Sequence, residues 1–238
     1  MKTASVKSEA TVGQQIPAWK GVLDLFVIFV TSPVWIPVAA LLVAWIGVVS
    51  PGPVIFRQQR VGAGGRRFSM WKFRTMCVDA VQTKHEDHLD RLVDGDFPMT
   101  KVDAQDERLI AGAKWVRALG LDELAQIVNV LKGEMSLVGP RPCTVSEYDR
   151  YAGLRGARTA VLPGITGWWQ TNGKNRLTFR RMLELDEYYA GHASLWMDMG
   201  ILFRTTGVVF EQLMDHAGQS DHSDDVHGRV ATAGVDQK

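Results

Sequence analysis

A long apolar run near the start of the chain constrains this fold more than any other feature. No Asp, Glu, Lys or Arg occurs between Leu25 and Phe56, and most of that stretch is Val, Ile, Leu, Ala, Phe and Trp. About 20 apolar residues in a helix cross the hydrocarbon core of a bilayer, so the run is long enough for a membrane segment. It is also longer than the core of a secretory signal and has no convincing small-residue cleavage site, which argues against a signal peptide.

Ser32-Pro33 and Pro37 lie inside this run and predict an interruption of the helix. A proline has no amide donor and clashes with the carbonyl four residues earlier, so the helix is expected to bend or break there. The piece before the break, residues 19–32, is too short to cross a bilayer alone. The residues by themselves leave two courses open, a re-entrant hairpin over 19–50 or a spanning helix with a proline kink.

Basic residues flank the apolar run on both sides, and such flanks favour the cytoplasmic face of a membrane. Both ends of the segment are therefore compatible with the cytoplasmic side, as a re-entrant course requires. These residues are Lys2, Lys7 and Lys20 before the run and Arg57, Arg60, Arg66, Arg67, Lys72 and Arg74 after it.

The overall composition narrows the class of protein. A net charge of +1 over 238 residues gives no field that would draw the whole chain to nucleic acid, so no nucleic-acid partner is expected. Cys77 and Cys143 form no CxxC pair, which argues against a disulfide framework or a zinc site. Both are expected to be reduced thiols in the core, which is compatible with a cytoplasmic compartment.

Outside the membrane segment the chain predicts one helix-rich α+β catalytic body. We expect a mobile lead-in over residues 1–18 and a catalytic domain at the cytosolic face over 51–214. An acidic, apolar-poor excursion is expected at about 79–107, and a disordered tail over 215–238.

A small hairpin and three helical segments are expected within the catalytic domain. Strands at 54–56 and 68–76 flank the Gly-rich turn 62–65, and alternation places Lys72 and Arg74 on one face of the second strand. The helical patterns, of which the last two read as amphipathic helices, cover 114–132 with a break at Gly120, 178–190 and 195–214, and rigid turns are expected at 139–142 and 163–167.

Asp122 and Glu123 are adjacent carboxylates that open a predicted helix after Gly120. Neighbouring residues of an α-helix point about 100° apart, so one carboxylate could attack a phosphorus atom while the other holds a metal. Mg²⁺ held by one or two carboxylates offsets phosphate charge, and a helix N-terminus favours anions. Acidic residues are also common in the first turn of any helix, so the pair alone does not establish catalysis.

Groups that could bind a diphosphate or a nucleotide lie near the pair in sequence. Guanidinium and ammonium groups clamp phosphates, and the candidates are Lys72, Arg74, Arg108, Arg117 and Arg141. Gln170 and Asn172 follow two tryptophans and could hydrogen-bond a base or a sugar, although tryptophans beside a Gly-rich turn more often pack the core.

A series of strings, in order along the chain, resembles the bacterial sugar transferase family, the monotopic polyprenyl-phosphate phosphoglycosyl transferases. The resemblance covers residues from about Lys20 to Thr205. The strings are GPVIFRQQRVG at 52–62, KFRTM at 72–76, LDELAQ at 121–126, NVLKG at 129–133, MSLVGPRP at 135–142, PGITGW at 163–168 and ELD at 184–186.

The resemblance implies a re-entrant helix-break-helix in the cytoplasmic leaflet of the bacterial inner membrane, with Ser32-Pro33 at the break. It implies that Asp122 attacks the sugar-bearing phosphate of a UDP-sugar, that UMP leaves, and that polyprenyl phosphate takes the phosphosugar from the enzyme. Glu123 would be the Mg²⁺ ligand and Arg141 a contact to the substrate. The expected role is the first membrane step of exopolysaccharide or glycoconjugate synthesis, with UDP-sugar, polyprenyl phosphate and membrane lipid as partners and a homodimer as a candidate assembly.

Several positions depart from the family pattern. Gly21, Leu162 and Lys174 stand where the family often has Arg, and the stretch from Asp24 to Ser32 is about one helical turn shorter than usual. These departures leave two alternatives open, a catalytically inactive membrane scaffold for glycan assembly and a metal-dependent phosphatase. The carboxylate pair itself is intact.

Overall fold

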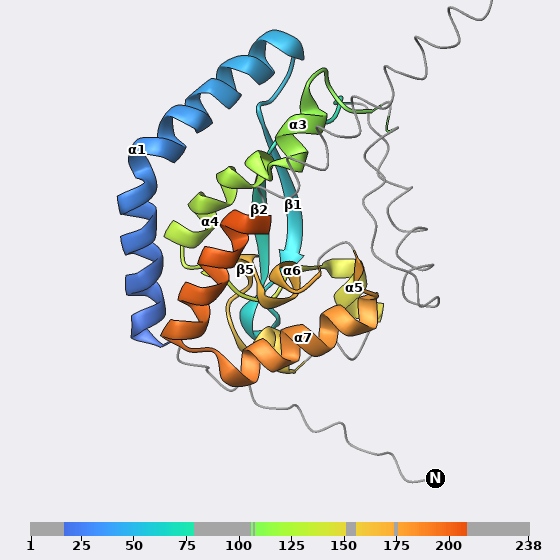
Figure 1. Cartoon of the computed structure of the whole chain (residues 1–238). Coiled ribbons are helices and arrows are strands. Elements are labelled where there is room, and N and C mark those ends of the chain that lie inside the picture. Colours follow the sequence, from blue (N-terminus) through green and yellow to red (C-terminus); the bar gives the residue numbers. More distant parts are fainter. Residues whose placement is uncertain (1–16, 79–105, 107, 151–155, 174–175, 209–238) are drawn as a thin grey trace, which may run out of the picture.

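The computed structural model describes residues 17–78, 106, 108–150, 156–173 and 176–208, and shows a helix-rich α+β fold (Figure 1). The predicted lead-in, acidic excursion and tail lie almost entirely outside the described residues. The elements are α1 (Ala18–Val49), β1 (Ile55–Val61), η1 (Ala63–Gly65), β2 (Arg67–Phe73), α3 (Ala113–Ala118), η2 (Leu121–Gln126), α4 (Ile127–Leu131), β3 (Ser136–Val138), β4 (Cys143–Thr144), α5 (Val145–Arg150), η4 (Ala157–Ala160), β5 (Gly164–Thr166), α6 (Trp168–Thr171), α7 (Phe179–His192) and a helix over 195–208.

The apolar run forms one continuous helix, α1, which contains both prolines and bends near its middle (Figure 1). The expected bend is present, but the expected break into two helices is not. The Ser32 hydroxyl replaces the donor that Pro33 lacks, since Ser32 Oγ donates to Phe29 O at 2.7 Å. Trp35 Nε1 also donates to the neighbouring carbonyl, Ile28 O, at 3.0 Å. Because these carbonyl groups keep hydrogen-bond partners, the helix can bend without ending.

The first turn of α1 is fixed to the protein body by a buried polar cluster. Lys20 is 3% exposed and donates to Asp198 Oδ2 at 2.6 Å and to Tyr189 Oη at 2.9 Å. One turn later, Asp24 accepts the N–H of Leu137 at 3.1 Å. The N-terminal end of α1 therefore packs against β3, α7 and the helix over 195–208.

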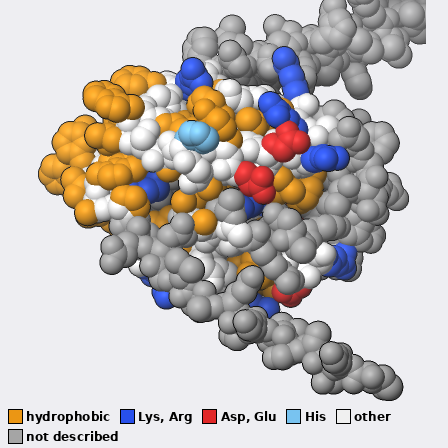
Figure 2. Space-filling view, turned by 90° about the horizontal axis from the view of Figure 1, so that it is seen from below, with side chains coloured by type: hydrophobic (Ala, Val, Ile, Leu, Met, Phe, Trp, Pro, Cys, Tyr) orange, Lys and Arg blue, Asp and Glu red, His pale blue; other side chains and the backbone are white. Residues whose placement is uncertain are grey.

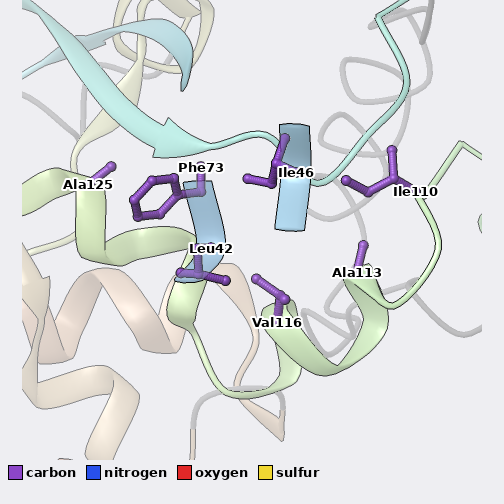
Figure 3. Packing of buried hydrophobic residues seen from close by; sticks show 7 residues of the cluster. All are labelled: Leu42, Ile46, Phe73, Ile110, Ala113, Val116 and Ala125. Carbon is purple, nitrogen blue, oxygen red and sulfur yellow. The ribbon is translucent and has the colours of Figure 1, made fainter. Parts of the chain in front are cut away.

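The C-terminal half of α1 packs into the largest hydrophobic cluster of the body. Leu42 and Ile46 point toward Phe73 of β2 and Val116 of α3 in this cluster, which Figure 3 shows from close by. Just past the helix, Arg74 donates to Ser50 Oγ at 2.9 Å and to Ser50 O at 2.7 Å. Both ends of α1 are thus anchored in the same body.

The remaining surface of α1 is apolar and exposed. Among the described residues α1 is the one helix that is long and apolar enough to cross a membrane. Figure 2 shows hydrophobic side chains gathered on the side where Figure 1 places α1. The exposed large apolar residues of α1 and of the helix over 195–208 are Val22, Leu25, Phe26, Phe29, Val30, Val34, Ile36, Leu41, Val43, Val48, Val49, Leu195, Trp196 and Phe203.

The predicted hairpin is confirmed, with a first strand that is longer than expected and a second strand that ends three residues earlier than expected. β1 pairs with β2 in an antiparallel register that joins Ile55 to Phe73 and Val61 to Arg67. The turn between them needs glycine, because Gly64 and Gly65 have φ values of 64° and 73°. β4 adds a short third strand on the other edge of β1.

The segment around the carboxylate pair departs from the expected α-helix. The break at Gly120 is confirmed, with φ at 68°, and α3 ends before it. Residues Leu121–Gln126 then form a 3₁₀-helix, η2, that continues into α4. Three residues per turn place successive side chains about 120° apart rather than 100°.

A two-stranded parallel sheet, β3 with β5, replaces the rigid turn expected at 163–167. The two strands touch at glycines, since a Cβ on Gly164 would lie 2.0 Å from Gly139 N. The thiol prediction is right for Cys143, which is buried, and wrong for Cys77, which is exposed after β2. Cys77 follows the last core position of the hairpin, so its side chain meets solvent.

Candidate active site

Asp122 and Glu123 are adjacent in the first turn of η2, which begins at Leu121 after the left-handed Gly120. The side chain of Asp122 is 10% exposed, whereas that of Glu123 is 31% exposed. The 3₁₀ geometry separates their directions, so the two carboxylates can contact different groups. The pair offers one sheltered carboxylate and one that reaches solvent.

Lys72 of β2 faces both carboxylates. Its Nζ atom lies 3.0 Å from Glu123 Oε1 and 3.8 Å from Asp122 Oδ2. The hairpin prediction placed Lys72 on one face of the second strand, and Lys72 lies where β2 contacts η2. An ammonium group here lies within ion-pair distance of both carboxylates and would attract a phosphate.

Asn129 fixes the position of β2, and with it Lys72. Asn129 is fully buried, accepts the N–H of Trp71 at 3.0 Å and donates to Ser69 O at 2.8 Å. These bonds tie α4 to the backbone of β2 on either side of Met70. Asn129 is the first residue of the NVLKG string, but the sequence did not predict a structural role for it.

A second set of charges surrounds the Gly139–Pro142 turn that carries Arg141. Arg60 donates to Pro142 O at 3.2 Å, and Arg158 donates to Arg141 O at 2.8 Å. Burial, and to a smaller extent the positive charge of Arg141, lowers the pKa of Arg60 to about 10. The negative charge of Glu123 acts in the opposite direction and raises this pKa. The backbone around Arg141 is therefore held by two buried cations, of which Arg60 lies within electrostatic reach of Glu123.

Two buried acids balance these cations. Glu147 Oε2 lies 3.9 Å from Arg60 Nη1, and Asp186 Oδ2 lies 3.0 Å from Arg158 Nε. Burial raises the pKa of Asp186 to about 6 despite the nearby Arg158 and Arg141. The sequence indicated Arg60 only as a basic flank of the membrane segment. No role was predicted for Arg158 or Glu147, because their ion-pair partners are distant in sequence.

Gln170 lies on α6 and lines a cavity that Glu123 also lines, so the structure brings these two predicted site residues to one opening. The amide of Gln170 donates to Ile165 O at 3.3 Å. Asn172 is exposed, and its amide donates to Trp168 O at 2.7 Å at the end of α6.

The other predicted phosphate contacts lie in different surroundings. Arg74 is buried and both of its terminal nitrogens are engaged with Ser50. Arg108 binds Asp106 through two hydrogen bonds of 2.7 and 2.6 Å, which hold the pKa of Asp106 at about 2. Arg117 Nη1 lies 3.4 Å from Thr75 Oγ1. Their roles toward substrate stay predictions.

The carboxylate pair fits the ligand needs of Mg²⁺. Within the described part of the chain, no group of three or more His, Cys, Asp or Glu side chains gathers. Mg²⁺ in phosphate-transfer sites is usually held by one or two carboxylates together with substrate phosphates, so a larger protein cage is not required. Glu123, the more exposed of the two, is the better placed to share a metal with a substrate.

Comparison with known proteins gives one family whose model, described as bacterial sugar transferase, matches residues 15–212. The chain is 45% identical over 161 residues to the galactosyl transferase CpsE of Streptococcus agalactiae, which covers 66% of this chain and 35% of that protein. It is 36% identical over 192 residues to the UDP-glucose:undecaprenyl-phosphate glucose-1-phosphate transferase of Escherichia coli, covering 77% of this chain and 38% of that protein.

A shorter relative matches over most of its length. The chain is 38% identical over 153 residues to the uncharacterized sugar transferase EpsL of Bacillus subtilis, covering 64% of this chain and 68% of that protein. By contrast, the chain spans only about a third of the length of the other two relatives.

Proposed function

Since this chain belongs to the bacterial sugar transferase family, we propose that it transfers a sugar 1-phosphate from a UDP-sugar to polyprenyl phosphate. One arrangement carries this proposal, namely the two adjacent carboxylates Asp122 and Glu123 with the ammonium of Lys72 between them. The reaction that names the Escherichia coli relative supports this class of donor and acceptor.

The proposed reaction has two steps at Asp122. A carboxylate oxygen of Asp122 attacks the sugar-bearing phosphorus of the UDP-sugar, the bond from that phosphorus to the bridging oxygen breaks, and UMP leaves with this oxygen. A phosphate oxygen of polyprenyl phosphate then attacks the same phosphorus, the acyl phosphate bond breaks, and Asp122 returns as a free carboxylate. The product is a polyprenyl diphosphate sugar.

The surrounding side chains have separate parts in this proposal. Lys72 stabilises negative charge that develops on the phosphoryl oxygens, and Arg141 contacts the departing nucleotide. Glu123 holds Mg²⁺, which when bound would offset phosphate charge. Asn129 and Arg158 position Lys72 and Arg141 through the backbone and do not touch substrate.

We further propose that α1 enters and leaves the membrane from the cytoplasmic face. Lys20 at its first turn and Ile46 near its end are both buried against one body, which supports a re-entrant course over a span. A straight span would carry one of these ends to the opposite side of the bilayer. The apolar face between them is free to enter lipid, and the bend at Ser32-Pro33 marks its deepest point.

Intact-mass measurement of the protein tests the chemistry. We expect wild-type protein, mixed with a panel of UDP-sugars and Mg²⁺ but no lipid, to gain the mass of one phosphosugar and to release one equivalent of UMP. Asp122→Asn should give no adduct, and Glu123→Gln should require more Mg²⁺. Glu187→Gln, an exposed acid on α7, is the matched control and should behave as wild type.

Turnover by Asp122→Asn at the wild-type rate would refute the covalent route. Steady release of free sugar phosphate or inorganic phosphate in the absence of lipid would instead favour a phosphatase. Folded wild-type protein that gains no mass from any UDP-sugar would favour an inactive scaffold.

Thiol labelling tests the course of α1. In a Cys77→Ser background, single cysteines at the exposed positions Ala18 and Pro51 flank the helix, while Cys143 stays buried. We expect a membrane-impermeant maleimide to label both only after the cytoplasmic face is opened. Labelling of either one in intact cells would show that α1 spans the bilayer.

A further inference from the structure

The buried face of α7 lies against the segment that carries Arg141. This face has the three- and four-residue spacing of one side of a helix and consists of Phe179, Met182, Asp186 and Tyr189. Tyr189 Oη lies 3.2 Å from Val138 O, just before the turn. One helical turn earlier on the same face, Asp186 reaches the carbonyl of Arg141 through Arg158. The position of α7 (Figure 1) is therefore coupled to the backbone that carries Arg141.

Arg158 joins Asp186 to the backbone of Arg141. Its Nε lies 3.0 Å from Asp186 Oδ2, and its Nη2 donates to Arg141 O at 2.8 Å. The side chains of Arg158 and Asp186 are 4% and 1% exposed, so little water screens the attraction between their charges. The carboxylate of Asp186 therefore holds the guanidinium of Arg158 in the place from which it donates to Arg141.

Asp186 also acts on Arg141 directly. The charge of Arg141 and its backbone N–H both lower the pKa of Asp186, against the effect of burial. Among the described residues, however, no well-aligned hydrogen bond reaches either oxygen of this carboxylate. The N–H of Arg141 is thus near enough to favour the charge without making a full hydrogen bond, and contacts of this kind often tighten when substrate binds.

Stability alone does not explain a charge at position 186. Burial raises the pKa of Asp186 to about 6, although Arg158 and Arg141 oppose the shift. A carboxyl group whose pKa is raised by folding destabilises the folded state at pH values where it is ionised. A buried charge that weakens the fold at neutral pH is typical of a functional site.

We propose that Asp186 is a positioning residue for donor binding, which acts through Arg158 to hold the Arg141 peptide so that the Arg141 guanidinium faces the nucleotide of the UDP-sugar. Asp186 and Arg158 do not touch substrate, because the fold closes both off from solvent. When the carboxyl group takes up a proton, its attraction to Arg158 is lost and donor binding weakens. The inference rests on the proposed function, because it explains how the nucleotide contact of that reaction is held in place.

The other ionisable groups around Asp186 keep their charge state while Asp186 takes up its proton. Arg158 of η4 and Arg141 of the turn face the carboxyl group directly. Glu147 of α5, which the same arginines and Arg60 of β1 influence, has a pKa below its ordinary 4.5 and stays ionised. Burial raises the pKa of the Cys143 thiol of β4 above its ordinary 9.0, so it stays neutral. A change in donor binding near pH 6 therefore reports on Asp186.

Removing the charge at position 186 tests the inference. Asp186→Asn keeps the shape of the side chain, and Asp149→Asn, which makes the same change in an exposed ion pair with Arg67, is the matched control. Where Asp186→Asn does not fold, the double variant Asp186→Leu, Arg158→Met removes both buried charges and leaves no ion unpaired. Circular dichroism and melting midpoints show that each variant is folded.

We expect Asp186→Asn, or the double variant, to raise the KM for the UDP-sugar in adduct formation by about tenfold at neutral pH, with a maximal rate within about threefold of wild type. The KM for undecaprenyl phosphate should not change. In wild-type protein the KM for the UDP-sugar should rise as the pH falls through about 6, whereas in Asp186→Asn it should be high and independent of pH over the same range. Asp149→Asn should follow wild type.

A folded Asp186→Asn protein with the wild-type KM for the UDP-sugar would overturn the inference. A smaller fraction of protein that forms adduct, at an unchanged KM, would show that Asp186 supports only the fold, and would overturn it as well.

If wild-type protein forms no adduct, the proposed function fails, and equilibrium titration with UMP decides the inference instead. Asp186→Asn should then bind UMP about tenfold more weakly than Asp149→Asn does. Equal Kd values for the two variants, or a wild-type protein that does not bind UMP, would overturn the positioning role.

Discussion

The ammonium of Lys20 lies 2.6 Å from Asp198 Oδ2 and joins the first turn of α1 to the helix over 195–208. Both side chains are almost fully buried, and Tyr189 donates to the other oxygen of the same carboxylate at 2.6 Å. Three polar groups from distant parts of the sequence thus satisfy one another inside an apolar interface. This contact keeps the N-terminal half of α1 against the body.

Lys20→Met is expected to destabilise the protein by about 3–5 kcal/mol, because it leaves the carboxylate of Asp198 buried without its cation. Thermal unfolding in detergent micelles measures the effect. Arg180→Met, an ion-pair partner that is 87% exposed, should change the midpoint little. The double variant Lys20→Met, Asp198→Leu should recover part of the loss, and a double variant weaker than Lys20→Met alone would contradict this account.

Lys72→Met is expected to slow adduct formation by about 100-fold, since it removes a charge that stabilises the developing phosphoryl oxygens. The rate of adduct formation is measured by stopping the reaction at set times and determining the intact mass of the protein. Lys132→Met is the matched control, because Lys132 lies 4.8 Å from the centre of the Trp71 ring and is exposed. Equal rates for Lys72→Met and wild type would remove Lys72 from the active site.

Gly164→Ala is expected to cost about 3 kcal/mol or more, because its Cβ would meet the backbone of Gly139 and Thr166 at 2.0 and 2.4 Å. The parallel contact between β3 and β5 leaves no flexible side chain that could move aside. Gly191→Ala on α7, where nothing lies within 4 Å, should instead be neutral or stabilise by up to about 1 kcal/mol. Melting midpoints of the two variants measure the contrast.

Glu147 should contribute to stability at neutral pH and lose that contribution in acid. Burial favours its protonated form, but the positive charges of Arg141 and Arg60 outweigh burial and lower the pKa of Glu147 below its ordinary 4.5. A lowered pKa in the folded state stabilises the fold above pH 4.5, and the benefit is lost as the pH falls toward the folded pKa.

Melting midpoints at pH 7 and pH 4 measure this dependence. Glu147→Gln should be less stable than wild type at pH 7, and the difference should shrink at pH 4. Glu184→Gln, which alters an exposed ion pair with Arg181, should follow wild type at both values. A difference that stays constant between the two values would contradict the role assigned to the Glu147 charge.

Local patterns predicted the elements that lie on either side of the candidate active site. The alternation in 68–76 and the glycines of the turn predicted the hairpin, and the break at Gly120 located the carboxylate pair. The pattern did not distinguish a 3₁₀-helix from an α-helix, because both place apolar residues three apart. The parallel contact of β3 with β5 was missed for a similar reason, since three-residue strands leave too short a pattern.

Contacts between distant residues could not be predicted from the sequence. The sequence indicated Lys20 only as a basic flank of the apolar run, and the structure buries it against Asp198. Arg60, Arg158 and Glu147 likewise gained their roles only from partners brought together by the fold. The prolines predicted a bend in α1 correctly, but the donors that keep the helix continuous come from side-chain geometry.

The pairing of Lys20 with Asp198 also sets an order of events during translation. The two residues are separated by 178 positions, which a ribosome takes about 10–35 s to synthesise at 5–20 residues per second. Throughout that interval Lys20 in the first turn of α1 lacks its buried partner Asp198, because Asp198 has not yet been made. The segment that is made first is therefore the last to be locked against the body.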